Sequence, residues 1–364
     1  MNEALLKRSD RRNRLTNKTF KFPQEIKDHF YTANYFSKTE EIIKTHLKDT
    51  VVTMQFFARE HGVLCGVDQA LSLLATFAVK PESLTVEALF DGDTIKPFEP
   101  VLKITGPYVN FGFLESLIDG ILTRQTNIAT NSKEVVKAAQ GKEVFSMADR
   151  QDDYLTQAGD GYASFIGGIT KFSTDAQGSY VDINGMGTMP HALIAMTGGD
   201  VVTASRLFLE TFPETPLTAL VDYHNDSVGD SLKVARAFGK KLSAIRLDTS
   251  RALADVVFSD GCSNFEEVRG VSKALVFKVR EALDREGFNY VKIVVSSGFN
   301  AEKIQDFEKD NVPVDMYGVG TYLLNNKTIG FTGDIVKVNG KAQAKVGREE
   351  YFSTRLETVK LTKN

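Results

Sequence analysis

Residues 217–248 read LTALVDYHNDSVGDSLKVARAFGKKLSAIRLD, and this stretch decides the fold class. The apolar runs LTALV and LSAIRL have the length of buried strands, and the segment between them, DSLKVARAFGKK, has the periodicity of an amphipathic helix. A strand, a helix and a strand in succession predict a parallel βαβ unit. Each predicted strand ends in an aspartate, Asp222 and Asp248, and ligands bind at this end of the strands in barrels and open α/β sheets.

The same alternation extends to both sides of this unit. Apolar runs predict further buried parallel strands at 143–148, 164–168, 291–298 and 314–321, and the segment 267–287 predicts another amphipathic helix. We therefore expect a β/α domain over residues 128–328.

The flanking segments have a different pattern. Residues 1–127 combine helical stretches, after Phe36 and near 69–78, with strands and turns around residue 100, and another helix follows from residue 111 to Gly141. Residues 329–364 contain hairpin-like strands with Gly and Asn turns. We expect this C-terminal segment to return to the N-terminal domain.

Composition excludes several classes of protein. The chain has 364 residues with 44 Lys and Arg against 47 Asp and Glu, a balance that argues against a nucleic-acid binder acting through bulk positive charge. No apolar run approaches the roughly 18 residues of a membrane span. The 2 cysteines cannot build a disulfide framework, which favours a reducing, cytoplasmic location. The basic segment 1–14 lacks a signal-peptide core and is interpreted as a solvated arm, with a transit peptide as the alternative.

The segment GMGTMPHALIAM, residues 185–196, contains the first candidate catalytic residue. We expect Thr188 to cap a helix whose first turn holds Pro190, with His191 beside it. The positive end of the helix dipole favours a neutral, nucleophilic imidazole and would stabilise a phosphate added to it. The alternative is a capped helix whose histidine only packs.

Charged residues at the two strand ends form a second candidate cluster. Asp222 and Asp248 could hold Mg²⁺ or ribose hydroxyls, and Arg246 suits a phosphate or carboxylate. The alternative is a strand-end salt bridge between Arg246 and a neighbouring acid.

Two glycine-containing junctions and one polar segment are the remaining candidates. VVSSGF and YGVGTYLL predict strand–turn–helix junctions whose backbone amides can hold phosphate, or alternatively two ordinary tight turns. Arg150 follows a strand end in SMADR, and Ser173 and Thr174 begin a predicted helix, for which a polar loop with a capping pair is the alternative.

The ordered set GTMPHAL, IRLDT, VSSGF and GVGT resembles the nicotinate phosphoribosyltransferases, and LESLIDGILTRQTNIAT resembles a helix that this family shares with quinolinate phosphoribosyltransferases. The resemblance covers residues 32–348. It implies an irregular β/α barrel of about seven strands and an N-terminal α/β sandwich domain completed by C-terminal strands. It also implies a homodimer or higher homo-oligomer in which one subunit's sandwich domain caps the other's barrel.

The resemblance also assigns roles to residues of this chain. His191 matches the histidine phosphorylated by ATP, Thr188 a nicotinate-contacting threonine, and Arg246 and Asp248 the pair that engages the base and the ribose phosphate. Asp222 matches a strand-end aspartate near the histidine.

Further matches lie outside that group. Arg150 matches the arginine of an F-G-x-R motif, and Tyr35 matches an aromatic residue that stacks on the pyridine from the neighbouring subunit. Thr174 stands where the nicotinamide enzymes carry an aspartate. The residues that match the phosphate loops are Gly298, Gly318, Gly320 and Thr321, and Ser297 beside them is a further candidate for phosphate binding.

Four positions depart from the family pattern. They are Ala33, Met147, Asn225 and Ser297. The implied function is transfer of a phosphoribosyl group from phosphoribosyl pyrophosphate to nicotinate in NAD biosynthesis, with ATP as co-substrate and Mg²⁺ carried by pyrophosphate. Nicotinamide or quinolinate as substrate, or a non-catalytic sensor of phosphoribosyl compounds, are the alternatives.

Overall fold

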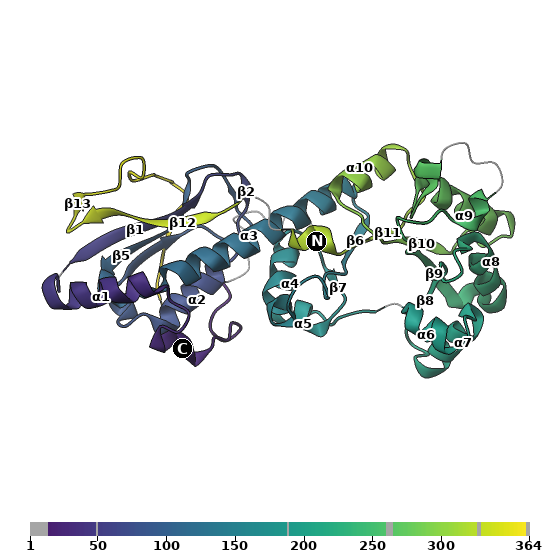
Figure 1. Ribbon diagram of the computed structural model, residues 1–364, viewed down its shortest axis with the longest axis horizontal. Helices are drawn as coiled ribbons and strands as arrows, with labels where there is room; N and C mark the ends of the chain where they lie inside the picture. The colour runs from purple at the N-terminus through teal and green to yellow at the C-terminus, as the bar shows by residue number, and fades with distance from the viewer. Residues whose placement is uncertain (1–13, 49, 188, 260–264, 326–328, 362–364) are drawn as a thin grey trace. The chain divides into compact units, whose positions relative to one another are not determined.

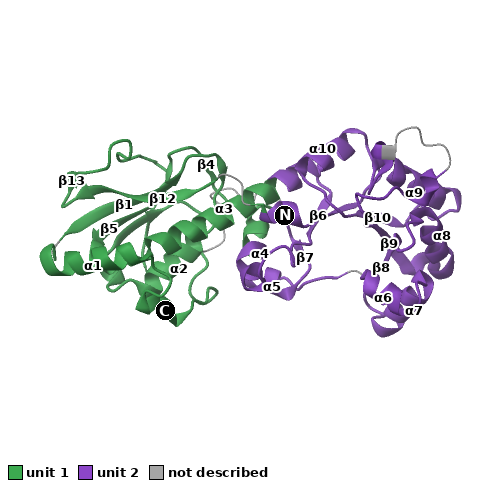
Figure 2. Cartoon of the chain, viewed as in Figure 1, with its two compact units in different colours: residues 1–133, 162–168, 325–364 green, residues 134–161, 169–324 purple. Residues whose placement is uncertain are grey.

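The computed structural model describes residues 14–48, 50–187, 189–259, 265–325 and 329–361. It divides into two compact units, one of residues 1–133, 162–168 and 325–364 and one of residues 134–161 and 169–324 (Figure 2). No helix in these ranges is long and apolar enough to cross a membrane.

An antiparallel sheet of strand order β13-β12-β1-β5-β3-β14 forms the centre of the first unit (Figure 1). Its strands are β1 (Val51–Ala58), β3 (Thr85–Ala88), β5 (Pro100–Pro107), β12 (Phe331–Val338), β13 (Lys341–Ala342) and β14 (Glu357–Val359). Because β12 pairs with β1 and β14 with β3, strands from the C-terminal segment complete this sheet. Strands β2 (Gly62–Val63) and β4 (Thr94–Ile95) form a separate pair.

The helices of the first unit include α1 (Asn34–His46), α2 (Val67–Phe77) and the first part of α3 (Glu115–Ala138). Apolar side chains from the sheet and from α2 and α3, such as Phe56, Leu73 and Ile118, are fully buried in one core. Each contributes about 1.5–3 kcal/mol through burial. The first helix, expected to start after Phe36, begins at Asn34, three residues earlier, and includes Tyr35.

The second unit contains a parallel sheet of strand order β7-β6-β11-β10-β9-β8, which curls into a half-barrel (Figure 1). Its strands are β6 (Glu143–Ser146), β7 (Lys171–Phe172), β8 (Leu217–Leu220), β9 (Leu242–Leu247), β10 (Lys292–Val295) and β11 (Met316–Val319). The edge strands β7 and β8 do not pair with each other in the described residues. A mixed α/β fold is confirmed, and the count of about seven barrel strands stays a prediction.

Helices connect the parallel strands as the alternating pattern predicts. They are α4 (Gln157–Ile166), α5 (Asp175–Gly178), α6 (His191–Met196), α7 (Val201–Thr211), α8 (Ser227–Phe238), α9 (Lys273–Arg285) and α10 (Ala301–Lys309). The short helix α11 (Thr321–Leu324) follows β11, the last parallel strand along the chain. Side chains cap several of them: Asp226 accepts from the Gly229 amide at α8 and Ser272 from the Leu275 amide at α9.

The predicted strand at 164–168 is wrong. Ser164 and Phe165 lie in the last turn of α4, and the strand of this region is β7, at Lys171–Phe172. A short apolar run fits a buried helix end as well as a strand, so periodicity alone does not separate the two.

Candidate active site

The register of the parallel sheet aligns the carboxyl ends of its strands. Leu220 of β8 pairs with Arg246 of β9, Arg246 pairs with Val294 of β10, and Val294 pairs with Met316 of β11. Two residues further along each strand come Asp222, Asp248, Ser296 and Gly318. The sheet therefore carries these four predicted strand-end positions at one level.

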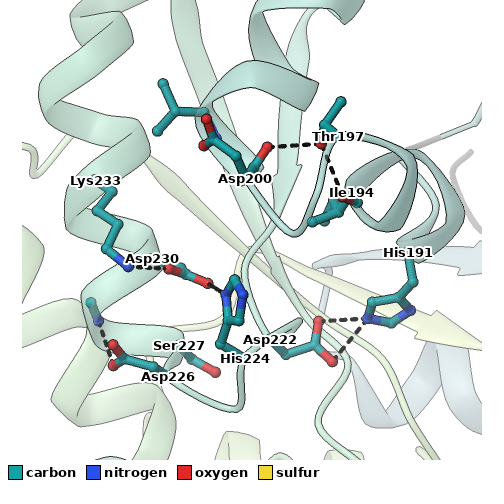
Figure 3. Close-up of polar contacts among 12 residues, drawn as sticks. His191, Ile194, Thr197, Asp200, Asp222, His224, Asp226, Ser227, Asp230 and Lys233 are labelled. Carbon is teal, nitrogen blue, oxygen red and sulfur yellow. Dashed lines mark hydrogen bonds and ion pairs between the residues drawn. The ribbon is translucent and has the colours of Figure 1, made fainter.

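His191 and Asp222 form the most direct contact of the site (Figure 3). The imidazole Nε2 lies 3.1 Å from each carboxylate oxygen of Asp222. The Asp222 side chain is only 7% exposed, whereas that of His191 is 43% exposed. Burial raises the pKa of Asp222, and the neighbouring His191 opposes this rise.

A second histidine–carboxylate pair lies beside the first (Figure 3). His224 Nδ1 is 3.3 Å from Asp230 Oδ2, and Lys233 Nζ donates to Asp230 Oδ1 at 2.8 Å. A Cβ on Gly199, which has φ +87°, would lie 3.0 Å from His224 Nε2. The loop after α6 therefore packs closely on the loop after β8, and these two loops flank His191 and Asp222.

Arg246, Asp248 and Ser296 form a second polar group on adjacent strands. Arg246 Nη2 lies 3.6 Å from Asp248 Oδ2, and Ser296 Oγ donates to Asp248 Oδ1 at 2.7 Å. The strand-end salt bridge is therefore present. Asp222 contributes to the electrostatic environment of Arg246 as well, so both polar groups belong to one neighbourhood.

Two guanidinium groups lie in this neighbourhood. Burial lowers the pKa of Arg246, and the charge of Arg150 lowers it further. Arg150 itself is exposed in the turn after β6. Two cations held close together favour an anionic ligand between or beside them.

The strand ends of β6 and β7 carry a separate hydrogen-bond network. Thr174 caps α5 by accepting from the Gln177 amide at 3.2 Å, and its hydroxyl donates to Gln157 Oε1 at 2.8 Å. Ser173 Oγ donates to Asp149 Oδ1 at 2.7 Å. The capping interpretation of Thr174 is thus observed, and its single hydroxyl proton is engaged by Gln157.

The two predicted phosphate loops follow β10 and β11. Ser297 and Gly298 both have φ of 72°, in the left-handed region. Gly320 precedes α11, whose first residue, Thr321, donates its hydroxyl to Gln151 Oε1 at 2.8 Å. A Cβ on Gly318 would lie 2.7 Å from Met147 Cε, so the methionine that departs from the family pattern packs on this loop.

Other predicted positions lie elsewhere or differ in detail. Tyr35 belongs to the first unit, on α1, with 64% of its surface exposed. Thr188 lies outside the described residues. Pro190 occupies the cap position with ψ 156° and α6 begins at His191, so the placement of Pro190 in the first turn is wrong.

Sequence reasoning missed the residues that support the predicted ones. Gln157 and Asp149 hold Thr174 and Ser173, and Gln151 holds Thr321. Polar side chains in loops carry no periodic signal, and only their partners' positions at strand ends could have pointed to them.

Among the described residues, no group of three or more His, Cys, Asp or Glu side chains could hold a metal ion. The charge of Asp248 adds to the rise in the pKa of Asp222, and a cation that brings most of its own ligands would reduce this repulsion between the two carboxylates.

Comparison with known protein families decides the classification. The family model of the quinolinate phosphoribosyl transferase N-terminal domain matches residues 34–126, and the family model of the C-terminal domain matches residues 128–332. The chain belongs to the quinolinate phosphoribosyl transferase family. This membership agrees with the resemblance of the sequence motifs to nicotinate and quinolinate phosphoribosyltransferases.

Several relatives of this family are similar to the chain. A nicotinate phosphoribosyltransferase of Mycobacterium tuberculosis is 27% identical over 313 residues, covering 78% of this chain and 65% of the relative. One of Bacillus subtilis is 27% identical over 239 residues, covering 64% of this chain and 44% of the relative. The chain thus spans less than two thirds of the length of these curated relatives.

Solved structures of the family have the same fold. A nicotinate-nucleotide pyrophosphorylase from Pyrococcus furiosus superposes with a TM-score of 0.79 at 32% identity, covering 93% of this chain and 85% of that one. Human nicotinic acid phosphoribosyltransferase superposes with a TM-score of 0.65 at 16% identity, covering 86% of this chain and 75% of that one.

Proposed function

We propose that this protein transfers the phosphoribosyl group of phosphoribosyl pyrophosphate to nicotinate, giving nicotinate mononucleotide and pyrophosphate in NAD biosynthesis. The observation that carries the proposal is the alignment of Asp222, Asp248 and Ser296 at one level of the sheet, with His191 on the first of them and Arg246 beside the second. Names of the relatives support nicotinate as the acceptor.

In the proposed reaction the pyridine nitrogen attacks the anomeric carbon of the ribose. A bond forms between this nitrogen and the carbon, and the bond from the carbon to the pyrophosphate oxygen breaks with its electron pair leaving on pyrophosphate. The transition state carries positive charge on the ribose ring, so the protein acts mainly by positioning and by charge.

The charged residues have complementary roles. Asp248, which accepts a hydrogen bond from Ser296, would bind ribose hydroxyls and stabilise the developing positive charge. Arg246, with Arg150 nearby, would bind the carboxylate of nicotinate or the ribose phosphate. The backbone at Gly298, Gly318 and Gly320 would hold phosphate oxygens.

His191 would couple ATP to the reaction. When Nε2 donates to Asp222, the lone pair of Nδ1 is left to attack the γ-phosphoryl group of ATP, with ADP as the leaving group. Hydrolysis of the phosphohistidine would then bias an otherwise reversible transfer. Asp222 fixes the tautomer that this role needs.

Mg²⁺ would arrive with the pyrophosphate, where it neutralises charge on the leaving group. Asp222 and Asp248 are the carboxylates of the site that could add a ligand to it. In the assembly that we propose, Tyr35 of one subunit stacks on the pyridine bound by another subunit of a homodimer or larger oligomer.

Quinolinate is a second candidate acceptor, favoured by the name of the family and by the adjacent guanidinium groups of Arg246 and Arg150. A panel of nicotinate, nicotinamide and quinolinate at fixed phosphoribosyl pyrophosphate and Mg²⁺ separates the candidates. We expect nicotinate to give the highest kcat/KM. Preferred use of quinolinate with release of CO₂ would contradict the proposal, and no product from any of them would favour a non-catalytic sensor.

A further inference from the structure

Two cationic side chains meet at the loop after β10. Arg251, in the loop after β9, donates a hydrogen bond from Nη2 to the carbonyl oxygen of Gly298. Lys303 lies in the first turn of α10, with its ammonium group 4.1 Å from the ring centre of Phe299 and 5.5 Å from that of Phe307. Burial and the charge of Arg251 together lower the pKa of Lys303 to about 8.

In the described residues, no carboxylate is paired with either of these two cations. Aromatic faces stabilise an ammonium group, but holding two like charges together in a partly dry site still costs free energy. A bound anion would offset that cost.

The backbone between the two cations is also short of partners. In the part of the chain that the structure describes, the amides of residues 297–300 donate to no protein oxygen. Ser297 and Gly298 both have φ of 72°, and successive amides in such a turn form a concave surface that binds anions. A Cβ at Gly298 would lie 2.1 Å from Nη2 of Arg251, so only glycine lets this guanidinium lie across the loop.

We propose that Arg251 and Lys303 bind a phosphoryl group of phosphoribosyl pyrophosphate from two sides of the Gly298 loop. This inference rests on the proposed function, since it assigns side chains to that substrate. The ligand chemistry is a phosphate dianion, and both the 5′-phosphate and the pyrophosphate of the substrate offer it. Arg251 supplies planar paired donors and Lys303 a compact charge, which together suit the several oxygens of one phosphoryl group.

The test uses Arg251→Gln and Lys303→Gln in the full chain, with Lys309→Gln, an exposed lysine at the far end of α10, as the matched control. Binding of ribose 5-phosphate and of pyrophosphate is measured by calorimetry. We expect both loop variants to weaken one of these two ligands by about tenfold or more, and Lys309→Gln to leave both unchanged. The ligand that weakens identifies which phosphoryl group is bound.

Two further measurements keep the proposal open to refutation. Lys303→Arg should restore binding to within a few-fold of wild type. In the wild-type protein, ribose 5-phosphate or pyrophosphate should protect Lys303 against acylation, followed by mass spectrometry, even if the variants do not fold. Unchanged affinity in folded variants, or no protection of Lys303, would overturn the proposal.

The outcome separates this inference from the proposed function. If the wild-type protein makes nicotinate mononucleotide and the loop variants keep the wild-type KM for phosphoribosyl pyrophosphate, the inference fails and the function stands. If the wild-type protein binds ribose 5-phosphate through Lys303 but transfers nothing to any pyridine, the function fails and the phosphate site stands.

Discussion

His191 and Asp222 face each other across the end of β8, with the imidazole Nε2 3.1 Å from both carboxylate oxygens. The carboxylate is nearly enclosed while the imidazole ring is partly exposed, and Nε2 is the ring nitrogen in contact with Asp222. The phosphohistidine that we propose needs a ring nitrogen that ATP can reach, and a partly exposed ring is compatible with that role.

Asp222→Asn tests the coupling role of this pair. The amide keeps the size of the side chain but removes the charge that fixes the imidazole, so we expect phosphorylation of the protein by γ-labelled ATP to fall about 10- to 100-fold, or roughly 1.4–2.7 kcal/mol.

ATP-independent synthesis of the mononucleotide should persist in His191→Ala. ATP stimulation that survives in a folded His191→Ala protein would refute the phosphohistidine.

Substitution of Thr174 tests how the site discriminates between nicotinate and nicotinamide. Thr174→Asp places a carboxylate near the predicted 3-substituent of the ring, and we expect kcat/KM for nicotinate to fall about tenfold or more, at least ~1.4 kcal/mol, with nicotinamide use unchanged or improved. Asp and Asn both cap helices well, so Thr174→Asn is the neutral control that keeps the cap on α5. Equal losses for both pyridines in Thr174→Asp would mean that the residue serves only the cap and Gln157.

Substitution of Tyr35 tests whether two subunits contribute residues to one active site. Tyr35→Ala should weaken nicotinate binding and leave binding of phosphoribosyl pyrophosphate largely intact. Random mixing of equal amounts of Tyr35→Ala and Asp248→Ala subunits should restore about a quarter of the wild-type sites, because half of the dimers are mixed and each mixed dimer has one intact site. No recovery in demonstrated mixed dimers would count against a contribution in trans.

The buried carboxyl group of Asp91 predicts how the stability of the first unit depends on pH. Its carboxylate accepts hydrogen bonds from the Val67 amide at 2.8 Å and from the Tyr162 hydroxyl at 2.9 Å. Burial and the charge of Asp68 raise the pKa of Asp91 to about 7. In the unfolded chain this pKa is about 3.9.

The folded state therefore keeps a proton that the unfolded chain loses as the pH rises from about 4 to about 7. Across this window the free energy of unfolding should fall, by up to about 1.4 kcal/mol per unit of pKa difference, and then level off. Urea unfolding at pH 5 and pH 8 measures the change. Asp91→Asn should reduce the difference in the free energy of unfolding between the two pH values. Asp28→Asn, which removes an exposed carboxylate, should leave this difference unchanged. An equal pH dependence in wild type and Asp91→Asn would contradict the raised pKa of Asp91.

Apolar runs that alternate with helical segments predict the parallel sheet, because a strand covered on both faces is continuously apolar. The residue at which such a run stops marks the carboxyl end of the strand. Asp222, Asp248 and Ser297 could be located in this way. The apolar run at 164–168 shows that a buried run alone does not identify a strand, since Phe165 is buried at the end of α4.

Contacts between distant segments have no such signal. Arg14, expected in a solvated arm, instead pairs with the buried Asp68 at 2.9 Å. Ser296, after β10, donates to Asp248, after the neighbouring strand β9, and Arg251 donates to Gly298, which lies 47 residues further along the chain. These pairs depend on the register of the sheet and on loop paths, which local periodicity does not encode.

The most direct test is product formation from nicotinate, phosphoribosyl pyrophosphate and Mg²⁺ by the wild-type protein and by Asp248→Asn. We predict that the wild-type protein releases one pyrophosphate for each nicotinate mononucleotide formed and that Asp248→Asn, with its fold verified, loses most of this activity. A wild-type protein that forms no mononucleotide, or an Asp248→Asn variant that forms it at the wild-type rate, would contradict the account.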